Sequence, residues 1–233
     1  AETLSRTIYA QPAIMATSLV CLEAAKKKGY TYEGVAGHSL GEYAAMVAAG
    51  MLSLEDGFKV IKARAEAMDK AAQNAEGAMC AVLKISAEEV EKLCEETEGY
   101  VVPANYNSTL QTVIAGEKAA VAAAAEAAAD KKARAKMLAV ASAFHTKLMQ
   151  PAAEEFEAAL KEMNITFNKP SVAFYSNLLG AEMTEFDGMP EKLAKHIVSP
   201  VKFTSELAAL QAEGYENFVE LGPNKVLTGL VKK

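Results

Sequence analysis

Apolar positions recur along the chain with two periods, one of about 3.6 residues that is typical of helices and one of about 2 that is typical of strands. In the first third of the chain these periods predict helix 11–29, strand 30–37, helix 40–50 and helix 53–73. The first helix has Pro12 near its first turn and Gly29 as its stop. Ser53 with Asp56 forms a capping-box start for the last of these helices.

The middle of the chain, residues 77–141, follows a different order. Its segments predict a strand, a helix, two strands separated by the turn-like "NST", an alanine-rich helix and a last strand, over 77–86, 87–96, 100–106, 111–116, 117–133 and 135–141. Ser86 with Glu89 forms a second capping box. The order β-α-β-β-α-β is typical of the ferredoxin-like split unit. We therefore expect an inserted subdomain at residues 76–141.

The last third of the chain returns to helices that alternate with strands. The pattern predicts helix 146–163, strand 171–177, helices 190–198 and 203–214, and strand 217–222. Alternation on both sides of the insert favours a parallel sheet. The expected fold class is therefore α/β, with a core formed by residues 1–75 and 142–233.

Composition and charge narrow the class of protein. The 233 residues are 51% hydrophobic and 23% charged, which suits one large domain or one domain with an insertion. The net charge of −6 argues against nucleic acid as a partner. No apolar run approaches the roughly 18 residues of a membrane helix, and the N-terminus lacks the apolar region of a signal peptide. We expect a cytoplasmic protein with no membrane partner.

The three cysteines have no spacing typical of a metal site. Cys80 and Cys94 lie in apolar surroundings, which predicts buried free thiols in a reducing compartment, and Cys21 completes an odd count. Histidine and cysteine never cluster along the chain. The sequence therefore indicates no metal and no prosthetic group.

The first stretch with chemical content is "GHSLG", residues 37–41, which lies between the predicted strand 30–37 and the helix that follows it. A serine at a sharp strand-to-helix turn presents its Oγ, and the flanking glycines let the backbone approach the next helix. Ser39 is therefore the candidate nucleophile, and the N–H of Leu40 is the candidate oxyanion donor. A glycine-rich phosphate-binding turn is the alternative interpretation.

A serine nucleophile needs a base, and the chain has three histidines. His38 adjoins Ser39, so we expect its side chain to point away from Oγ and to line the pocket. His145 lies at a predicted strand-to-helix junction, where active sites of α/β sheets gather, and is the candidate base. His196 lies near the end of a helix and is interpreted as a surface or capping residue.

Arg64 stands on the long predicted helix between two small residues, Ala63 and Ala65. A guanidinium on the inner face of a helix either forms a structural salt bridge or clamps a carboxylate with two hydrogen bonds. Periodicity alone leaves both interpretations open. If Arg64 reaches the Ser39 pocket, the substrate should carry a free carboxylate besides its acyl group.

These segments together resemble the malonyl-CoA:acyl carrier protein transacylases of fatty acid synthesis and the acyltransferase domains of polyketide synthases. The resemblance covers nearly the whole chain and rests on "QPAIMATS", "GHSLGEYAAMVAAG", "ARAEAM", "NYNS", "VIAG", "AFHTKLMQPA" and "ELGPNKVLTGLVKK". It implies a hydrolase-like core with a ferredoxin-like subdomain and a monomer. It also implies that a malonyl group moves from coenzyme A to Ser39 and then to the phosphopantetheine thiol of acyl carrier protein.

The resemblance also implies roles for individual residues. His145 would be the base of a Ser–His dyad, and its second nitrogen would bond a backbone carbonyl near His196. Arg64 would clamp the malonyl carboxylate. The remaining pocket residues would be Gln11, Met68, Phe144, which narrows the pocket against a methylmalonyl branch, and Asn107 on the subdomain side.

Three features depart from the family pattern. Family members begin with a strand and a "GQGxQ" loop whose glutamine N–H is the second oxyanion donor, and this sequence holds no such segment. The tail after "LTGLVKK" also looks shortened, and "VASAFH" replaces the serine and glycine that many relatives carry after the valine. On this pattern we expect one oxyanion donor, Leu40, in place of two.

Three rival functions remain open from the sequence. A serine thioesterase or esterase would need an acid between Ser39 and His145, for which Asp130 is available. A patatin-like lipase would use Asp187 of "FDGMP". A silent module would bind acyl carrier protein without catalysis. Either of two basic stretches, Lys131–Lys136 (with Lys132 and Arg134) or Lys26–Lys28, is a candidate docking site for that acidic partner.

Overall fold

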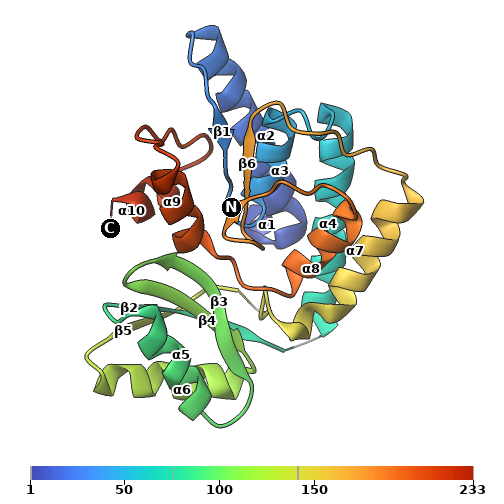
Figure 1. Cartoon of the computed structure of the whole chain (residues 1–233). Coiled ribbons are helices and arrows are strands. Elements are labelled where there is room, and N and C mark those ends of the chain that lie inside the picture. Colours follow the sequence, from blue (N-terminus) through green and yellow to red (C-terminus); the bar gives the residue numbers. More distant parts are fainter. Residues whose placement is uncertain (1, 75, 141, 233) are drawn as a thin grey trace.

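The computed structural model describes residues 2–74, 76–140 and 142–232, and two separate sheets divide it into two lobes (Figure 1). We call the lobe around the four-stranded sheet, Ala78–Met137, the small lobe, and the remainder the core lobe. The expected lobe boundaries at 75/76 and 141/142 fall on residues 75 and 141, which lie outside the described residues.

The core lobe is mainly helical. Its elements are α1 (Glu2–Ser5), α2 (Thr7–Lys27), β1 (Gly34–Val35), α3 (Gly41–Ala48), α4 (Leu54–Asn74), a 3-10 turn (Lys147–Met149), α7 (Gln150–Glu162), β6 (Ala173–Ser176), β7 (Ala181–Glu182), α8 (Met189–Ile197), α9 (Phe203–Ala212) and α10 (Val226–Val231). Helix α4 packs between α2 and α7 and buries Val60 and Ile61 completely. Strands β1 and β6 pair in parallel, and β7 adds to β6 antiparallel.

The small lobe contains β2 (Ala78–Leu83), α5 (Ala87–Glu96), β3 (Val101–Ser108), β4 (Gln111–Gly116), α6 (Lys118–Asp130) and β5 (Arg134–Met137). Its sheet has the order β3-β4-β2-β5, and all neighbours are antiparallel. Helices α5 and α6 cover one face, where Val82 and Ile114 pack with Val90 and Val121 (Figure 1). The opposite face of the sheet packs on Ala143 and Phe144, which belong to the core lobe.

The two lobes are joined by backbone hydrogen bonds as well as by the chain. Val201 of the core lobe donates to Ala104 O at 2.9 Å and accepts from Tyr106 N at 2.9 Å, so it extends the edge of β3. The Thr204 hydroxyl donates to Tyr106 O at 3.0 Å. These bonds fix the position of β3 against the loop that leads into α9.

The structure corrects several expectations about the elements. The first helix begins at Thr7 instead of residue 11, so Pro12 lies inside α2. Only two residues of the expected strand 30–37 pair as β1. Strand β3 continues to Ser108, so only Thr109 of the expected turn "NST" lies in the turn itself. Residues 217–222 form no strand, and Val219 is 62% exposed. An extended segment becomes a strand only when a neighbour pairs with its backbone, which an apolar pattern does not guarantee.

The expected parallel sheet is also smaller than the alternation suggested. Among the described strands β1 and β6 alone pair in parallel, besides the isolated parallel bridge between Asn105 and Val201. The described core lobe therefore holds a short mixed sheet flanked by helices. Helix α2 is long and apolar enough to cross a membrane by length and composition, contrary to the expectation from the sequence. One face of α2 packs against α3 and α4 and buries Met15 and Leu19, whereas Val20 on the same helix is 70% exposed.

Candidate active site

Ser39 lies in the turn between β1 and α3, and its φ of 53° is in the left-handed region. Residues with a Cβ rarely adopt this conformation, which is typical of a strained turn at a functional site. A Cβ on Gly37 would collide with the backbone of Gly41 and Glu42, whereas a Cβ on Gly41 would meet nothing within 4 Å. Only the first glycine of "GHSLG" is therefore required for the close approach.

His145 faces Ser39 from the other side of the site. Its Nε2 lies 2.8 Å from Ser39 Oγ, and its Nδ1 lies 3.0 Å from His196 O and 3.1 Å from Ser199 O. Two carbonyl oxygens can only accept, so the proton of the neutral ring belongs on Nδ1. Nε2 is then free to accept the proton of the serine hydroxyl.

The environment of His145 keeps the ring neutral. Its side chain is buried, and burial lowers the pKa of His145 well below the usual range of histidine. The nearby His196 and Arg64 lower this pKa further because they disfavour a second positive charge. His145 is thus unprotonated near neutral pH, as a general base must be.

Arg64 reaches the same place from α4 and is 1% exposed. Its Nη2 donates to Ser39 Oγ at 3.1 Å, and its Nη1 donates to Gln11 Oε1 at 2.5 Å. Its Nε has no hydrogen-bond partner, and none of the described carboxylates lies within salt-bridge distance of it. The structural salt bridge that periodicity had left open is therefore not formed within the described part of the chain.

These residues surround a cavity of about 220 Å³ between the lobes. It is lined by Thr7, Gln11, His38, Ser39, Leu40, Arg64, Met68, Met79, Asn105, Phe144 and His145. Eight of these eleven had been named from the sequence, and Thr7, Met79 and Asn105 had not. Asn107 does not line the cavity but lies behind it, with its Oδ1 2.7 Å from His38 Nε2. This contact ties the His38 ring to a side chain of β3.

His196 differs from its interpretation as a surface or capping residue. It is 1% exposed, and its Nδ1 lies 2.9 Å from Glu42 Oε2. The apolar periodicity of α8 did not reveal this burial because histidine occurs on both faces of helices. It contacts the dyad through its main-chain carbonyl and through its ring, whose centroid lies 5.0 Å from that of the His145 ring.

The candidate oxyanion donor is available. None of the described residues accepts a hydrogen bond from Leu40 N–H, whereas Gly41, Glu42 and Tyr43 donate to the carbonyls three residues before them. Leu40 is the N-cap of α3 and follows the serine directly. A free N–H in this place can stabilise negative charge on an oxygen bound beside Ser39.

Asp130 and Asp187 stand outside this arrangement. Asp130 is the exposed last residue of α6, and Asp187 is an exposed residue of the turn before α8. The second nitrogen of His145 is already occupied by carbonyls. The acids that a hydrolase or a patatin-like lipase would need are therefore not those named from the sequence.

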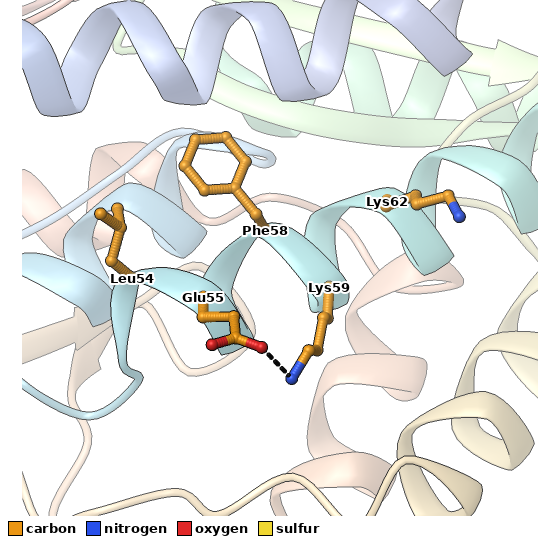
Figure 2. A pocket seen from close by; sticks show the side chains of 5 residues that line it. All are labelled: Leu54, Glu55, Phe58, Lys59 and Lys62. Carbon is orange, nitrogen blue, oxygen red and sulfur yellow. Dashed lines mark ion pairs between the residues drawn. The ribbon is translucent and has the colours of Figure 1, made fainter.

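A second hollow lies on the outer surface of α4 (Figure 2). It has a volume of about 600 Å³ and is lined by Leu54, Glu55, Phe58, Lys59 and Lys62. The polar contact among them is the 2.8 Å ion pair between Lys59 and Glu55, one helical turn apart. Such a pair is a solvated helix face, so this hollow carries no chemistry. Over residues 2–74, 76–140 and 142–232, no three His, Cys, Asp or Glu side chains are placed to hold a metal ion.

Comparison with known proteins points to one family. The chain matches the sequence profile of the acyl transferase domain over residues 1–233. It is 43% identical over 237 residues to the malonyl CoA-acyl carrier protein transacylase of Bacillus subtilis, an alignment that covers 100% of this chain and 74% of that protein.

Solved structures agree with the sequence comparison. The crystal structure of malonyl CoA-acyl carrier protein transacylase from Clostridium perfringens matches with a TM-score of 0.93 and 38% identity, over 100% of this chain and 73% of that one. A complex of a type II polyketide synthase acyl-carrier protein with its malonyl-transacylase matches with a TM-score of 0.93 and 33% identity, over 99% and 75% of the two chains.

Proposed function

The chain belongs to the acyl transferase domain family, and from that premise we propose that it transfers a malonyl group from malonyl-CoA to the phosphopantetheine thiol of acyl carrier protein in fatty acid biosynthesis. The relatives of known name act on malonyl-CoA and acyl carrier protein, and one is a complex with an acyl-carrier protein. The reaction would be a two-step acyl transfer through an ester on Ser39.

The observation that supports malonyl as the transferred group is that the buried Arg64 has no carboxylate partner among the described residues. A buried guanidinium without a carboxylate partner is costly, and a substrate that brings a carboxylate removes that cost. One Nη donates to Gln11 and the other donates to Ser39 Oγ. The Nε–H has no partner and can bind an anion beside the nucleophile. An acetyl group would leave the guanidinium unpaired, which gives selectivity against it.

In the first step the Ser39 Oγ attacks the thioester carbonyl of malonyl-CoA while His145 Nε2 takes the hydroxyl proton. Leu40 N–H donates to the oxyanion of the tetrahedral intermediate. The C–S bond then breaks, and the coenzyme A sulfur leaves with the proton that His145 had taken. The product is a malonyl ester on Ser39, with a neutral imidazole beside it.

In the second step the same imidazole takes the proton from the phosphopantetheine thiol of acyl carrier protein. The resulting thiolate attacks the Ser39 ester, and His145 returns the proton to Oγ as the ester bond breaks. Both steps need a base that is neutral and oriented before the acceptor arrives. The backbone carbonyls at His145 Nδ1 and its lowered pKa support this assignment.

The finer parts of the fold and the setting belong to the same proposal. We infer a hydrolase-like core from the serine turn between β1 and α3, and a ferredoxin-like subdomain at 76–141 from the β-α-β-β-α-β order with sheet order β3-β4-β2-β5. The buried free thiols of Cys80 and Cys94 support a cytoplasmic location. We further propose that the protein acts as a monomer, without a bound cofactor.

For docking of acyl carrier protein we favour the basic stretch of the small lobe, Lys131–Lys136. Lys132, Arg134 and Lys136 are exposed or partly exposed, and β5 is the edge strand from which the chain continues to His145. The other candidate, Lys26–Lys28, lies at the C-terminal end of α2, which Figure 1 shows far from the small lobe. A positive edge near the cavity suits an acidic carrier.

Transfer can be separated from hydrolysis with labelled malonyl-CoA. The protein is incubated with the label, freed of excess, and then mixed with acyl carrier protein that carries its phosphopantetheine arm. We expect label on Ser39 first and on the carrier afterwards, and no label on Ser39→Ala. The exposed serine of α9, in the variant Ser205→Ala, provides the matched control.

Two results would contradict the proposed function. Release of free malonate at the same rate with and without the carrier would identify a thioesterase. No label on the intact wild-type protein would identify a silent binding module.

A further inference from the structure

A buried asparagine outside the cavity, Asn177, follows β6 and lies directly under the Ser39 turn. It is 0% exposed, and its Oδ1 accepts from Ser39 N–H at 2.6 Å. Its Nδ2 donates to Gly37 O at 2.6 Å and to Glu206 Oε2 at 2.5 Å. Its own backbone N–H donates to Glu42 Oε1 at 2.6 Å. Both side-chain donors and the side-chain acceptor are therefore in use.

The bonds of Asn177 hold the turn on both sides of His38. One reaches the carbonyl of Gly37 and the other reaches the amide of Ser39. Ser39 has a left-handed backbone, which a residue with a Cβ keeps only when its surroundings hold it there. Because Ser39 N–H points to Asn177, the free N–H beside the nucleophile is that of Leu40.

Asn177 is itself held by two glutamates from different helices. Glu42 belongs to the first turn of α3, and Glu206 belongs to the first turn of α9. Both are buried, and burial followed by repulsion from Glu42 raises the pKa of Glu206 well above its usual range. The raised pKa favours the neutral carboxyl form, and Glu206 Oε1 has no hydrogen-bond partner, so a glutamine amide is a close mimic of this side chain.

We propose that Asn177 is a positioning residue for acyl transfer, which holds the Gly37 carbonyl and the Ser39 amide so that Ser39 Oγ stays within reach of His145 Nε2. Glu42 and Glu206 fix the asparagine from α3 and α9. The inference rests on the proposed role of Ser39 as the nucleophile. Asn177 touches neither substrate nor the reacting atoms, so its effect should fall on the rate of acylation and not on substrate binding.

The decisive comparison uses Asn177→Asp and the double variant Asn177→Asp with Glu206→Gln. Aspartate keeps the acceptor for Ser39 N–H but loses the donors to Gly37 O and Glu206. We expect the single-turnover rate of Ser39 acylation, measured per folded molecule, to fall on the order of 10- to 100-fold. The half-saturating malonyl-CoA concentration should stay within about twofold because Arg64 and Gln11 are untouched.

The double variant tests which group donates and which accepts in the hydrogen bond between residues 177 and 206. The glutamine amide can donate to the new carboxylate, so we expect it to restore the acylation rate at least about fivefold over Asn177→Asp. Asn164→Asp, an exposed asparagine with a positive φ after α7, is the matched control. Acylation rates of the single variant within about twofold of wild type, or no recovery in a folded double variant, would overturn the proposal.

A measurement on the wild-type protein covers the case in which Asn177→Asp does not fold. Amide hydrogen exchange should protect Ser39 N–H, which donates to a buried acceptor, more strongly than Leu40 N–H, which has none. Equal exchange of the two amides would overturn the proposal. Failure of the proposed function looks different, because wild type would then show no ester on Ser39 at all.

Discussion

The interior of the small lobe and the residues beneath the Ser39 turn are equally buried, yet they contain opposite kinds of side chain. In the small lobe Val82, Ile114 and Val121 are each 0% exposed. Beneath and beside Ser39 the corresponding groups are polar or charged: Glu42 at 2%, Arg64 at 1%, and Asn177 and Glu206 at 0%. The extent of burial alone therefore does not say what a buried residue does.

The two kinds of burial have opposite effects on the free energy of folding. Apolar burial stabilises the folded lobe in proportion to the area removed from water. Burial of an unpaired charge or a neutralised carboxyl group opposes folding and is retained where it serves another purpose. Substitutions in the small lobe should therefore change stability with little effect on acylation, and substitutions around Ser39 should do the reverse.

The largest effect should come from the base. We expect His145→Ala to lower the rate of Ser39 acylation by roughly 10²–10⁴ because no other described group can accept the Oγ proton at 2.8 Å. Rapid quench-flow with labelled malonyl-CoA measures the rate, and thermal unfolding checks that the variant is folded. A loss below about tenfold would mean that His145 is not the base.

The next largest effect should fall on substrate choice. We expect Arg64→Ala to lower kcat/KM for malonyl-CoA on the order of 10²–10³ because two charge-assisted hydrogen bonds to the carboxylate are lost. The value for acetyl-CoA, which has no carboxylate, should change far less. Arg6→Ala removes an exposed guanidinium paired with Asp69 and is the control. Equal losses of kcat/KM for malonyl-CoA and acetyl-CoA would contradict the role of Arg64 as the carboxylate clamp.

A substitution in the interior of the small lobe should change stability and leave activity intact. We expect Ile114→Ala to lower the free energy of unfolding by about 2–5 kcal/mol because it leaves a cavity between the sheet and its helices. Denaturant titration measures this loss. Acylation per folded molecule should remain within about twofold of wild type, since Ile114 faces α5 and α6 and not the cavity. A larger loss of activity would show that the two regions are not separable.

The two glycines of "GHSLG" make a smaller comparison within one motif. A Cβ on Gly37 collides with backbone, so Gly37→Ala should destabilise by about 1–3 kcal/mol and slow acylation. Gly41 begins α3 with open space around it, so Gly41→Ala should be neutral or stabilising by up to about 1 kcal/mol. Chemical denaturation of both variants decides, and equal effects would contradict the geometry.

The smallest effect concerns pH. Since the pKa of His145 is lowered, the ring stays neutral, and acylation should lose less than about a fifth of its rate between pH 8 and about 6.5, where an unshifted histidine would lose half. The unfolded chain takes up a proton near pH 6.5 that the folded chain does not, so this group costs stability as pH falls below about 6.5. A half-maximal rate at about pH 6.5 would contradict the shift.

The sequence brought the candidate reacting groups to light more readily than the residues that support them. Ser39 and His145 are recognisable because the motif and the scarcity of histidine leave few alternatives, and the capping box at Ser86 marked the start of α5 correctly. Asn177 was missed, although a polar residue directly after a strand at the carboxyl edge of a sheet is a usable signal. Its partners Glu42 and Glu206 come from two helices far apart in the chain, and no local pattern encodes that meeting.

Pairing between distant segments explains the other differences. Residues 217–222 have the apolar pattern of a strand but form none, and the chain from 30 to 37 pairs over two residues only. The small lobe, whose paired strands lie closer in sequence than β1 and β6 do, has every strand that its pattern predicted. Local contacts can be read from local patterns, whereas the core sheet depends on partners that the pattern does not name.

The central claim is that Ser39 takes a malonyl group selected by Arg64. Its most direct test is intact-protein mass spectrometry after brief incubation with equal amounts of malonyl-CoA and acetyl-CoA. We predict that wild type gains the mass of one malonyl group on Ser39, that Ser39→Ala gains none, and that Arg64→Ala loses the preference. Equal malonyl and acetyl adducts on wild type, or an adduct that persists in Ser39→Ala, would contradict the account.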